Sequence, residues 1–160
     1  MVRKTKEVEF PGHRIKINEK EKTIEECYGI GKNPVVLIRE KTLSGKWLEG
    51  FKSPGNVLVD ISFPEFTCLC PKTGHPDFAS IRIIYIPDKL CVELKAYKYY
   101  LNSFRNEGHF HEQVMVLLEA ELRKFLRPTK LALIGDFNMR GGMEPYIEVG
   151  DGIDEAFNQD

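Results

Sequence analysis

Residues 56–63 of the chain have the sequence NVLVDISF, and this stretch decides the fold more clearly than any other. Apolar side chains occupy every second position from Val57 to Phe63, which is the period of a strand with one buried face. Pro64 is expected to end this strand. A second strand is predicted over residues 80–86, which are rich in isoleucine and are followed by a proline.

The period then changes to that of helices. Apolar residues recur at helical spacing over residues 93–105, and a second apolar stripe extends from about residue 109 to residue 126, just before Pro128. The first stripe consists of Leu94, Tyr97, Leu101 and Phe104, and the second of Phe110, Val114, Leu117, Leu118, Leu122 and Phe125. Two more strands are predicted over residues 131–137 and 145–149.

The predicted order is therefore strand, strand, helix, helix, strand, strand. Strands and helices segregated in this way indicate an α+β fold, with an antiparallel sheet and two helices on one face. Such a sheet has open edges, which favours pairing between subunits. We expect residues 51–150 to form the catalytic domain, residues 1–50 to be an N-terminal extension packed on it, and residues 151–160 to be an acidic tail.

Composition restricts the possible functions of the protein only weakly. The 160 residues are 42% apolar and 29% charged, as in an ordinary globular domain. A net charge of -1 gives no overall attraction to nucleic acid or to an anionic membrane. Because no apolar segment resembles a signal peptide or a membrane span, we expect a cytoplasmic protein with neither kind of partner. Its four cysteines are then expected to be free thiols.

The clearest chemical signal is the stretch FTCLCPKTGHPDF at residues 66–78, which places Cys70 seven residues before Asp77. Two prolines and a glycine keep this segment from forming a helix or a central strand. A thiol and a carboxylate on one loop suggest covalent chemistry, although a buried cysteine and a turn aspartate would give the same pattern. Cys68 and nearby histidines do not complete a recognisable zinc motif, so no metal is expected.

Three further clusters lie at the ends of the predicted elements. Lys95 and Lys98 are three residues apart on one helix face, where they could bind phosphate or simply face solvent. Glu112 lies at a helix N-terminus, where it could complement the dipole or accept the paired N–H groups of a guanine-like base. His111 beside it could donate to a ring carbonyl or shuttle a proton.

The third cluster is NMRGG at residues 138–142. Its glycines would let the backbone approach a ligand, and Arg140 offers a planar fork to a phosphate. An ordinary hairpin turn would have the same sequence.

Taken together, these motifs resemble a known family. The sequence ELKAYKY at residues 93–99 is similar, position by position, to the signature helix of the NADPH-dependent 7-cyano-7-deazaguanine reductases, the nitrile reductases of queuosine biosynthesis in tRNA modification. The loop LCPKTGHPDF, the sequence FHE at residues 110–112 and RGG at residues 140–142 follow the same order as in that family. The resemblance covers about residues 50–150 and is to the short, single-module form.

The resemblance implies a tunnelling fold, in which sheets join between subunits into barrels and active sites lie at subunit interfaces. The short form is typically a decamer of two stacked pentamers, with a small deazaguanine as substrate. Cys70 matches the nucleophile that forms a thioimide with the nitrile, and Asp77 matches the general acid and base. The residues that match substrate contacts are Val92, Glu93, Leu94, His111 and Glu112, and those that match the NADPH-binding region are Lys95, Lys98, Arg140 and Gly141.

Two other functions remain compatible with parts of the sequence. A related amidinotransferase acts on the same nitrile in tRNA and shares the cysteine and aspartate, but it lacks the lysine-bearing helix and needs no NADPH. A zinc-dependent cyclohydrolase of the same fold would use Cys70 as a metal ligand and would need more cysteine or histidine ligands. A non-enzymatic module would leave Cys70, Asp77 and Glu112 without a common purpose.

Overall fold

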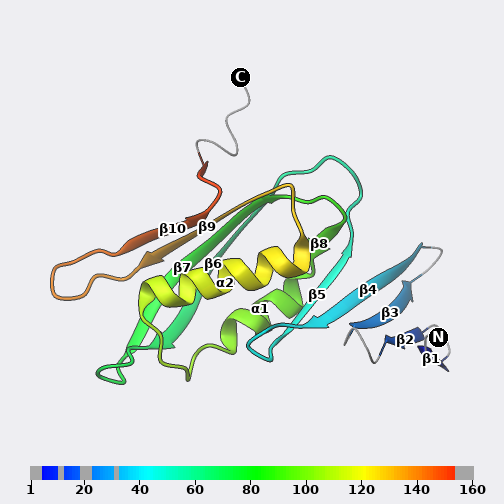
Figure 1. Ribbon diagram of the computed structural model, residues 1–160, viewed down its shortest axis with the longest axis horizontal. Coiled ribbons are helices and arrows are strands. Elements are labelled where there is room, and N and C mark those ends of the chain that lie inside the picture. Colours follow the sequence, from blue (N-terminus) through cyan, green and yellow to red (C-terminus); the bar gives the residue numbers. More distant parts are fainter. Residues whose placement is uncertain (1–4, 11–12, 19–22, 31–32, 154–160) are drawn as a thin grey trace.

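The computed structural model of the chain describes residues 5–10, 13–18, 23–30 and 33–153, with side chains described from residue 35 onward. Two helices and ten strands lie within these ranges (Figure 1). The strands are β1 (Thr5–Phe10), β2 (His13–Asn18), β3 (Thr23–Ile30), β4 (Asn33–Lys41), β5 (Trp47–Lys52), β6 (Val59–Leu69), β7 (Pro76–Ile86), β8 (Leu90–Val92), β9 (Lys130–Phe137) and β10 (Tyr146–Gly150), and the helices are α1 (Leu94–Asn102) and α2 (His111–Leu126).

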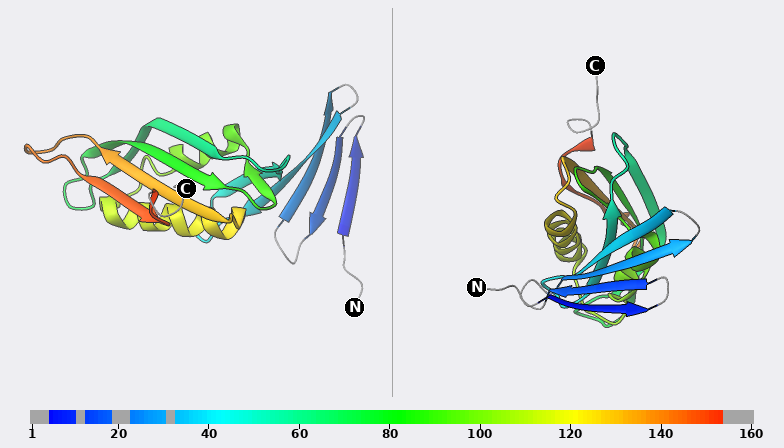
Figure 2. Two further views of the ribbon diagram at one scale, coloured as in Figure 1. Left: turned by 90° about the horizontal axis from the view of Figure 1, so that it is seen from above. Right: turned by 90° about the vertical axis from the view of Figure 1, so that its right-hand side faces the viewer.

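The strands form two antiparallel sheets. Four of them make a sheet in the order β10-β9-β7-β6, and α1 and α2 both lie on one face of it (Figures 1 and 2). The other six make a sheet in the order β1-β2-β3-β4-β5-β8, in which β5 pairs with the short β8 that precedes α1. The prediction of an α+β fold with antiparallel strands and two helices on one face is therefore confirmed.

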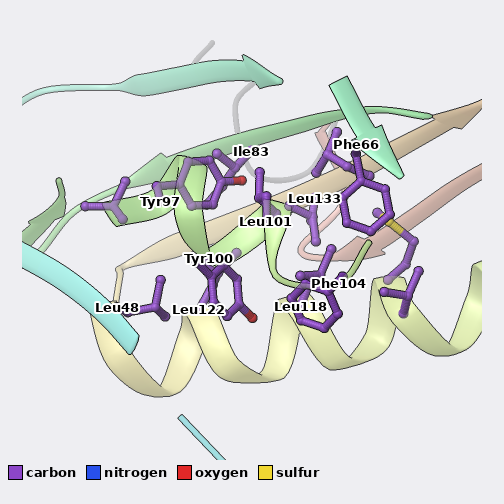
Figure 3. Close-up of a cluster of buried hydrophobic side chains, with 14 of the residues drawn as sticks. Leu48, Phe66, Ile83, Tyr97, Tyr100, Leu101, Phe104, Leu118, Leu122 and Leu133 are labelled. Carbon is purple, nitrogen blue, oxygen red and sulfur yellow. The ribbon is translucent and has the colours of Figure 1, made fainter. Parts of the chain in front are cut away.

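The core lies between the helices and the four-stranded sheet. Tyr97, Leu101 and Phe104, all buried, face Leu118 and Leu122 of α2 and side chains of the strands (Figure 3). Two of the three buried residues of α1 are tyrosines, Tyr97 and Tyr100. Such large side chains fill the space between two layers that short side chains would leave open. The predicted apolar stripes are thus the buried faces of the helices.

Two members of those stripes are in fact exposed. Leu94 is the first residue of α1 and is 61% exposed, and Phe110 is the N-cap of α2 and is 50% exposed. A residue at the first turn of a helix projects past the end of the packed layer, so the apolar pattern overestimated how far each buried face extends.

The prediction that Pro64 ends the first strand is wrong, because β6 continues through it to Leu69. The pairing of β6 with β7 shifts between Phe63 and Phe66, so Pro64 lies in a bulge. β6 is also an edge strand, where the missing N–H of a proline removes no ladder bond. β7 likewise begins earlier than predicted, at Pro76, a strand position that tolerates proline. The segment around Cys70 is therefore a tight turn of residues 70–75.

The division into residues 1–50, 51–150 and 151–160 stays a prediction. The N-terminal segment contains β1 to β4, and β5 runs across residue 50. Asp151 is tied to β9, because its N–H donates to Leu131 O at 2.7 Å and its carboxylate accepts from Leu131 N at 3.0 Å. Residues 154–160 of the predicted tail lie outside the described residues. Neither helix described here is long and apolar enough to cross a membrane.

Candidate active site

Cys70 directly follows the last residue of β6 and begins the turn to β7. Its N–H donates to His75 O at 2.8 Å, and its carbonyl accepts from Gly74 N at 2.8 Å. Gly74 has a φ of +72°, a left-handed conformation that residues with a Cβ rarely adopt. These bonds fix the backbone of the turn, and the Cys70 side chain is half-buried within it.

The turn also favours the thiolate. The pKa of Cys70 is lowered from the ordinary thiol value, first because the Thr73 hydroxyl donates to the sulfur, and then because the N–H groups of Thr73 and Lys72 do. Partial burial and the charge of Asp77 oppose this effect. Cys68, two residues earlier, is fully buried, and burial raises its pKa to about 11. Of the two free thiols in this stretch, only Cys70 is suited to act as a nucleophile near neutral pH.

Asp77, the second residue of β7, is only 6% exposed and lies opposite Cys68 in the β6–β7 pairing. Its carboxylate contacts an imidazole and a guanidinium: Oδ2 lies 3.2 Å from His111 Nε2, and Oδ1 lies 2.7 Å from Arg140 Nε. A buried carboxylate requires such partners to offset the loss of hydration. The charge of Asp77 also acts on the Cys70 thiol. The structure thus brings Cys70, Asp77, His111 and Arg140 into one site.

His111 is held by packing as well as by its contact with Asp77. It is the first residue of α2, and its ring stacks on Phe137 at the end of β9, with centroids 3.9 Å apart and planes 12° apart. This contact fixes the plane of the imidazole so that Nε2 faces Asp77. Glu112, in the first turn of α2, is exposed beside it. Phe137 and Thr73 were missed by the sequence reasoning, because a strand-end aromatic and a turn threonine are common elsewhere in proteins.

Arg140 lies in the hairpin between β9 and β10. Its backbone N–H and carbonyl each bond Met143 at 2.9 Å. Gly141 and Gly142 have φ values of +56° and +78°, and no atom lies within 4 Å of the position a Cβ would take on either. The segment is thus a glycine-containing hairpin turn, and its backbone at Gly141 and Gly142 is accessible to a ligand. The Arg140 guanidinium also donates from Nη2 to Pro76 O, so it is bound to the start of β7.

A second group of predicted residues surrounds the start of α1. Glu93 is the N-cap, and its carboxylate accepts from Lys95 N at 3.0 Å and Ala96 N at 2.7 Å. Val92 N donates to the hydroxyl of Tyr85 at 2.9 Å. An apolar cleft of about 410 Å³ opens here, lined by Phe51, Val59, Ile61, Tyr85, Cys91, Val92, Glu93 and Leu94. Lys95 and Lys98 are exposed on α1.

The two groups lie at opposite ends of the β6–β7 hairpin (Figure 1). Asp77 is at the start of β7, and Tyr85, which contacts Val92, is near its end. At about 3.3 Å per residue, these two positions are about 26 Å apart along the strand. One chain therefore does not bring all the predicted site residues together.

Among the residues that the structure describes, no three His, Cys, Asp or Glu side chains are grouped as metal ligands. That no metal takes part stays a prediction.

The fold and the site together define the class of this protein, an α+β domain with a half-buried thiol on which the charge of a carboxylate acts, and an imidazole in contact with that carboxylate. The fold matches the crystal structure of the archaeosine synthase QueF-Like in the apo form, with a TM-score of 0.54 over 63% of this chain and 97% of that one. Sequence identity to that protein is 21%, so the likeness is one of fold.

Sequence comparison identifies the family. The family model of the QueF-like proteins matches residues 76–155. The chain is 49% identical over 89 residues to the NADPH-dependent 7-cyano-7-deazaguanine reductase of Thermomicrobium roseum, covering 56% of this chain and 70% of the relative. It is 45% identical over 105 residues to the enzyme of that name from Aquifex aeolicus, covering 64% and 81%. The chain belongs to the QueF-like protein family, which confirms the predicted resemblance.

Proposed function

We propose that this chain reduces the nitrile of 7-cyano-7-deazaguanine to the primary amine 7-aminomethyl-7-deazaguanine, through a covalent thioimide on Cys70, for tRNA queuosine biosynthesis in the cytoplasm. That it is an NADPH-dependent oxidoreductase follows from its kinship with reductases of that name. The substrate is a small molecule, and neither nucleic acid nor a membrane takes part.

The observation that carries the proposal is the pairing of a thiol of lowered pKa with a buried carboxylate. Cys70 supplies the thiolate, and Asp77, held by His111 and Arg140, is the group that can exchange protons beside it. A nitrile carbon is a weak electrophile, so a thiolate and a proton donor at its nitrogen are needed together.

The chemistry balances with these residues. The Cys70 sulfur forms a bond to the nitrile carbon, and the thiol proton passes through Asp77 to the nitrile nitrogen, which gives a neutral thioimide. NADPH, when bound, supplies two hydrides to the same carbon. Addition of the first hydride would be followed by cleavage of the C–S bond, which would leave an imine and the Cys70 thiolate, and a proton delivered through Asp77 would restore the thiol. Asp77 relays the protons that reach the nitrogen, so that two hydrides and two protons convert nitrile to amine.

His111 and Glu112 are proposed to hold the deazaguanine ring at this end of the site. Glu112 is exposed at the N-terminus of α2, where its carboxylate is free to accept the paired N–H groups of the base. Val92, Glu93 and Leu94 are proposed to contact the substrate from the cleft at the other end of the domain. Because the Glu93 carboxylate caps α1, its contact with the substrate has to use the remaining lone pairs or the backbone.

The residues proposed for NADPH fit a phosphate-bearing cofactor in charge and in space. Lys95 and Lys98 are exposed cations, and Gly141 leaves open space where a side chain would otherwise project. Arg140 differs, since its guanidinium is bound to Asp77 and to the Pro76 carbonyl. Arg140 therefore has to share its donors between the cofactor and the start of β7.

We further propose that the complete site forms between copies of the chain, in an oligomeric barrel of tunnelling folds, as a decamer of two pentamers. The separation of about 26 Å between the Cys70 end and the Val92 end supports this, because no single chain spans it with one small substrate. β6 and β10 are the edges of the four-stranded sheet, available for pairing between subunits.

The test is to mix the purified protein with 7-cyano-7-deazaguanine, follow NADPH consumption, and measure adducts by intact mass. Two NADPH consumed per amine formed, with an adduct that Cys70→Ala removes, is the expected result. Full activity in Cys70→Ala would overturn the mechanism. An adduct without NADPH consumption would favour the amidinotransferase. If the protein gave neither an adduct nor NADPH consumption, a metal assay would test the cyclohydrolase.

A further inference from the structure

The segment between the two helices, residues 107–109, lies against the end of β6 next to Cys70. Leu69 N donates to Glu107 O at 2.9 Å, and His109 N donates to Leu69 O at 3.0 Å, which makes a parallel bridge between Leu69 and Gly108. Because β6 is an edge strand, these bonds occupy its open side at Leu69, its last residue. The residue before Cys70 is thus paired with β7 on one side and with this segment on the other.

Gly108 packs directly on the residue that follows Cys70. A Cβ at Gly108 would lie 3.3 Å from Pro71 Cα and 3.4 Å from Pro71 Cβ. Contacts this close would force the neighbour to shift, and Pro71 Cα is backbone that cannot move alone. A glycine is therefore required at position 108, because its backbone closely approaches the backbone of Pro71, the residue after the nucleophile.

Glu107 fixes the segment to the rest of the domain. Its Oε2 forms an ion pair with Lys46 Nζ, and its Oε1 accepts from His109 Nε2 at 3.2 Å. Lys46, from the β4–β5 turn, is 13% exposed, and its Nζ lies 4.4 Å over the ring of the fully buried Phe104. Burial raises the pKa of Glu107, but the bonds from Lys46 and His109 outweigh it and leave that pKa lowered, so the carboxylate stays charged.

The same segment leads directly into the other half of the site. His111, two residues after His109, begins α2 and contacts Asp77. Residues 107–109 thus link the strand end that carries Cys70 to the helix start that carries the imidazole facing Asp77.

We propose that Glu107 and Gly108 are positioning residues for the nucleophile, which brace residues 107–109 against β6 and so hold Cys70 in register with Asp77 and His111. The expected effect of these residues on turnover rests on the proposed function, but their expected effect on the reactivity of Cys70 does not. Neither residue touches the reacting atoms. The brace acts through Leu69 and Pro71, the two chain neighbours of Cys70.

The test compares Glu107→Gln and Gly108→Ala with the wild type in three measurements: the pH profile of iodoacetamide alkylation at Cys70, kcat and KM, and the melting temperature. A shifted turn weakens the bonds from Thr73 and Lys72 to the thiolate, so the alkylation midpoint should rise by on the order of half a pH unit. Turnover should fall about fivefold to fiftyfold, with KM changed less than about twofold. Cys70→Ala gives the alkylation background.

Controls separate positioning from general stability. Lys46→Met should repeat the effect of Glu107→Gln, and Lys46→Arg, which keeps the cation, should restore the wild-type profile. Gly152→Ala has open space around its Cβ and should change nothing. If Gly108→Ala fails to fold, the Glu107 and Lys46 variants carry the test alone.

The brace would be overturned if Glu107→Gln and Lys46→Met left the alkylation profile and kcat unchanged. It would also be overturned if turnover and thiol reactivity fell only in proportion to the melting temperature. Alkylation requires neither NADPH nor nitrile. A shifted profile in a protein without reductase activity would therefore support the brace while rejecting the proposed reaction.

Discussion

Two cysteines separated by one residue have opposite chemical character in this protein. Cys68 faces the core, where burial raises its pKa, while Cys70 lies in a turn whose hydroxyl and N–H groups lower its pKa. The sequence indicated Cys70 as the candidate nucleophile through the family resemblance. It could not show why, because the donors come from the local geometry of residues 70–75.

Replacing Thr73 with valine removes the donor that contributes most to the lowered pKa of Cys70. The pKa of the thiol should rise toward its ordinary value, so the thiolate should appear only at higher pH. Alkylation of Cys70 at pH 7 should slow by about twofold to tenfold. The measurement is the alkylation rate between pH 5 and about pH 10. Thr73→Ser keeps the hydroxyl and should match the wild type, and a valine variant with the same midpoint would contradict the assignment.

Glu112→Leu should weaken substrate binding by about tenfold to a hundredfold, because bonds between a carboxylate and the N–H groups of a base are charge-assisted. NADPH affinity should stay within about twofold, since Glu112 is not proposed to contact the cofactor. Isothermal titration with each ligand separates the two. Glu119→Leu makes the same change two turns further along α2 and serves as the control. Equal weakening of both ligands would count against the role of Glu112.

At the scale of elements, the order of strands and helices was predictable but their ends were not. Alternation and helical periodicity are repeated over many residues, so they survive local exceptions. The continuation of β6 past Pro64 depends on a bulge and on an open edge, neither of which a single sequence specifies. The burial of Glu121 was not predictable from the sequence either. This carboxylate interrupts an apolar face of α2 and is nevertheless only 2% exposed.

Glu121 links three elements through its carboxylate. It accepts from Ser44 N and Ser44 Oγ at 2.8 Å each, and from the Tyr100 hydroxyl at 2.9 Å. Burial and the charge of Glu121 raise the pKa of Tyr100, which keeps this hydroxyl protonated as a donor. α2 is thereby fixed both to α1 and to the turn between β4 and β5.

Glu121→Leu should lower the free energy of unfolding by about 3 kcal/mol, because it leaves buried donors without an acceptor. Glu121→Gln keeps one acceptor oxygen and should cost about 1 kcal/mol. Guanidinium unfolding measures both. Glu119→Gln breaks only an i,i+4 pair with Arg123 and should cost less than about 0.5 kcal/mol. If the leucine variant is as stable as this control, the carboxylate is not a structural link.

At the scale of the whole molecule, the sequence predicted a set of site residues but could not place them relative to one another. Cys70, Asp77, His111 and Arg140 gather at one end because the β6–β7 turn, the start of α2 and the β9–β10 hairpin meet there (Figure 1). Val92, Glu93, Leu94 and Lys95 lie at the other end, beside Tyr85. Motif order along a chain does not reveal such a separation, which follows from the length of the hairpin.

This separation predicts that two inactive variants restore each other's activity when they are mixed. Cys70→Ala damages one end of the domain, and Lys95→Glu, which reverses an exposed charge at the start of α1, damages the other. If each site combines the two ends of neighbouring copies, co-refolded equimolar variants should regain up to about one quarter of wild-type turnover, since some interfaces pair two intact ends. Turnover is measured as NADPH consumption with the nitrile substrate, against each variant refolded alone. Activity that stays at the level of the single variants would place the whole site within one chain and reject the shared interface.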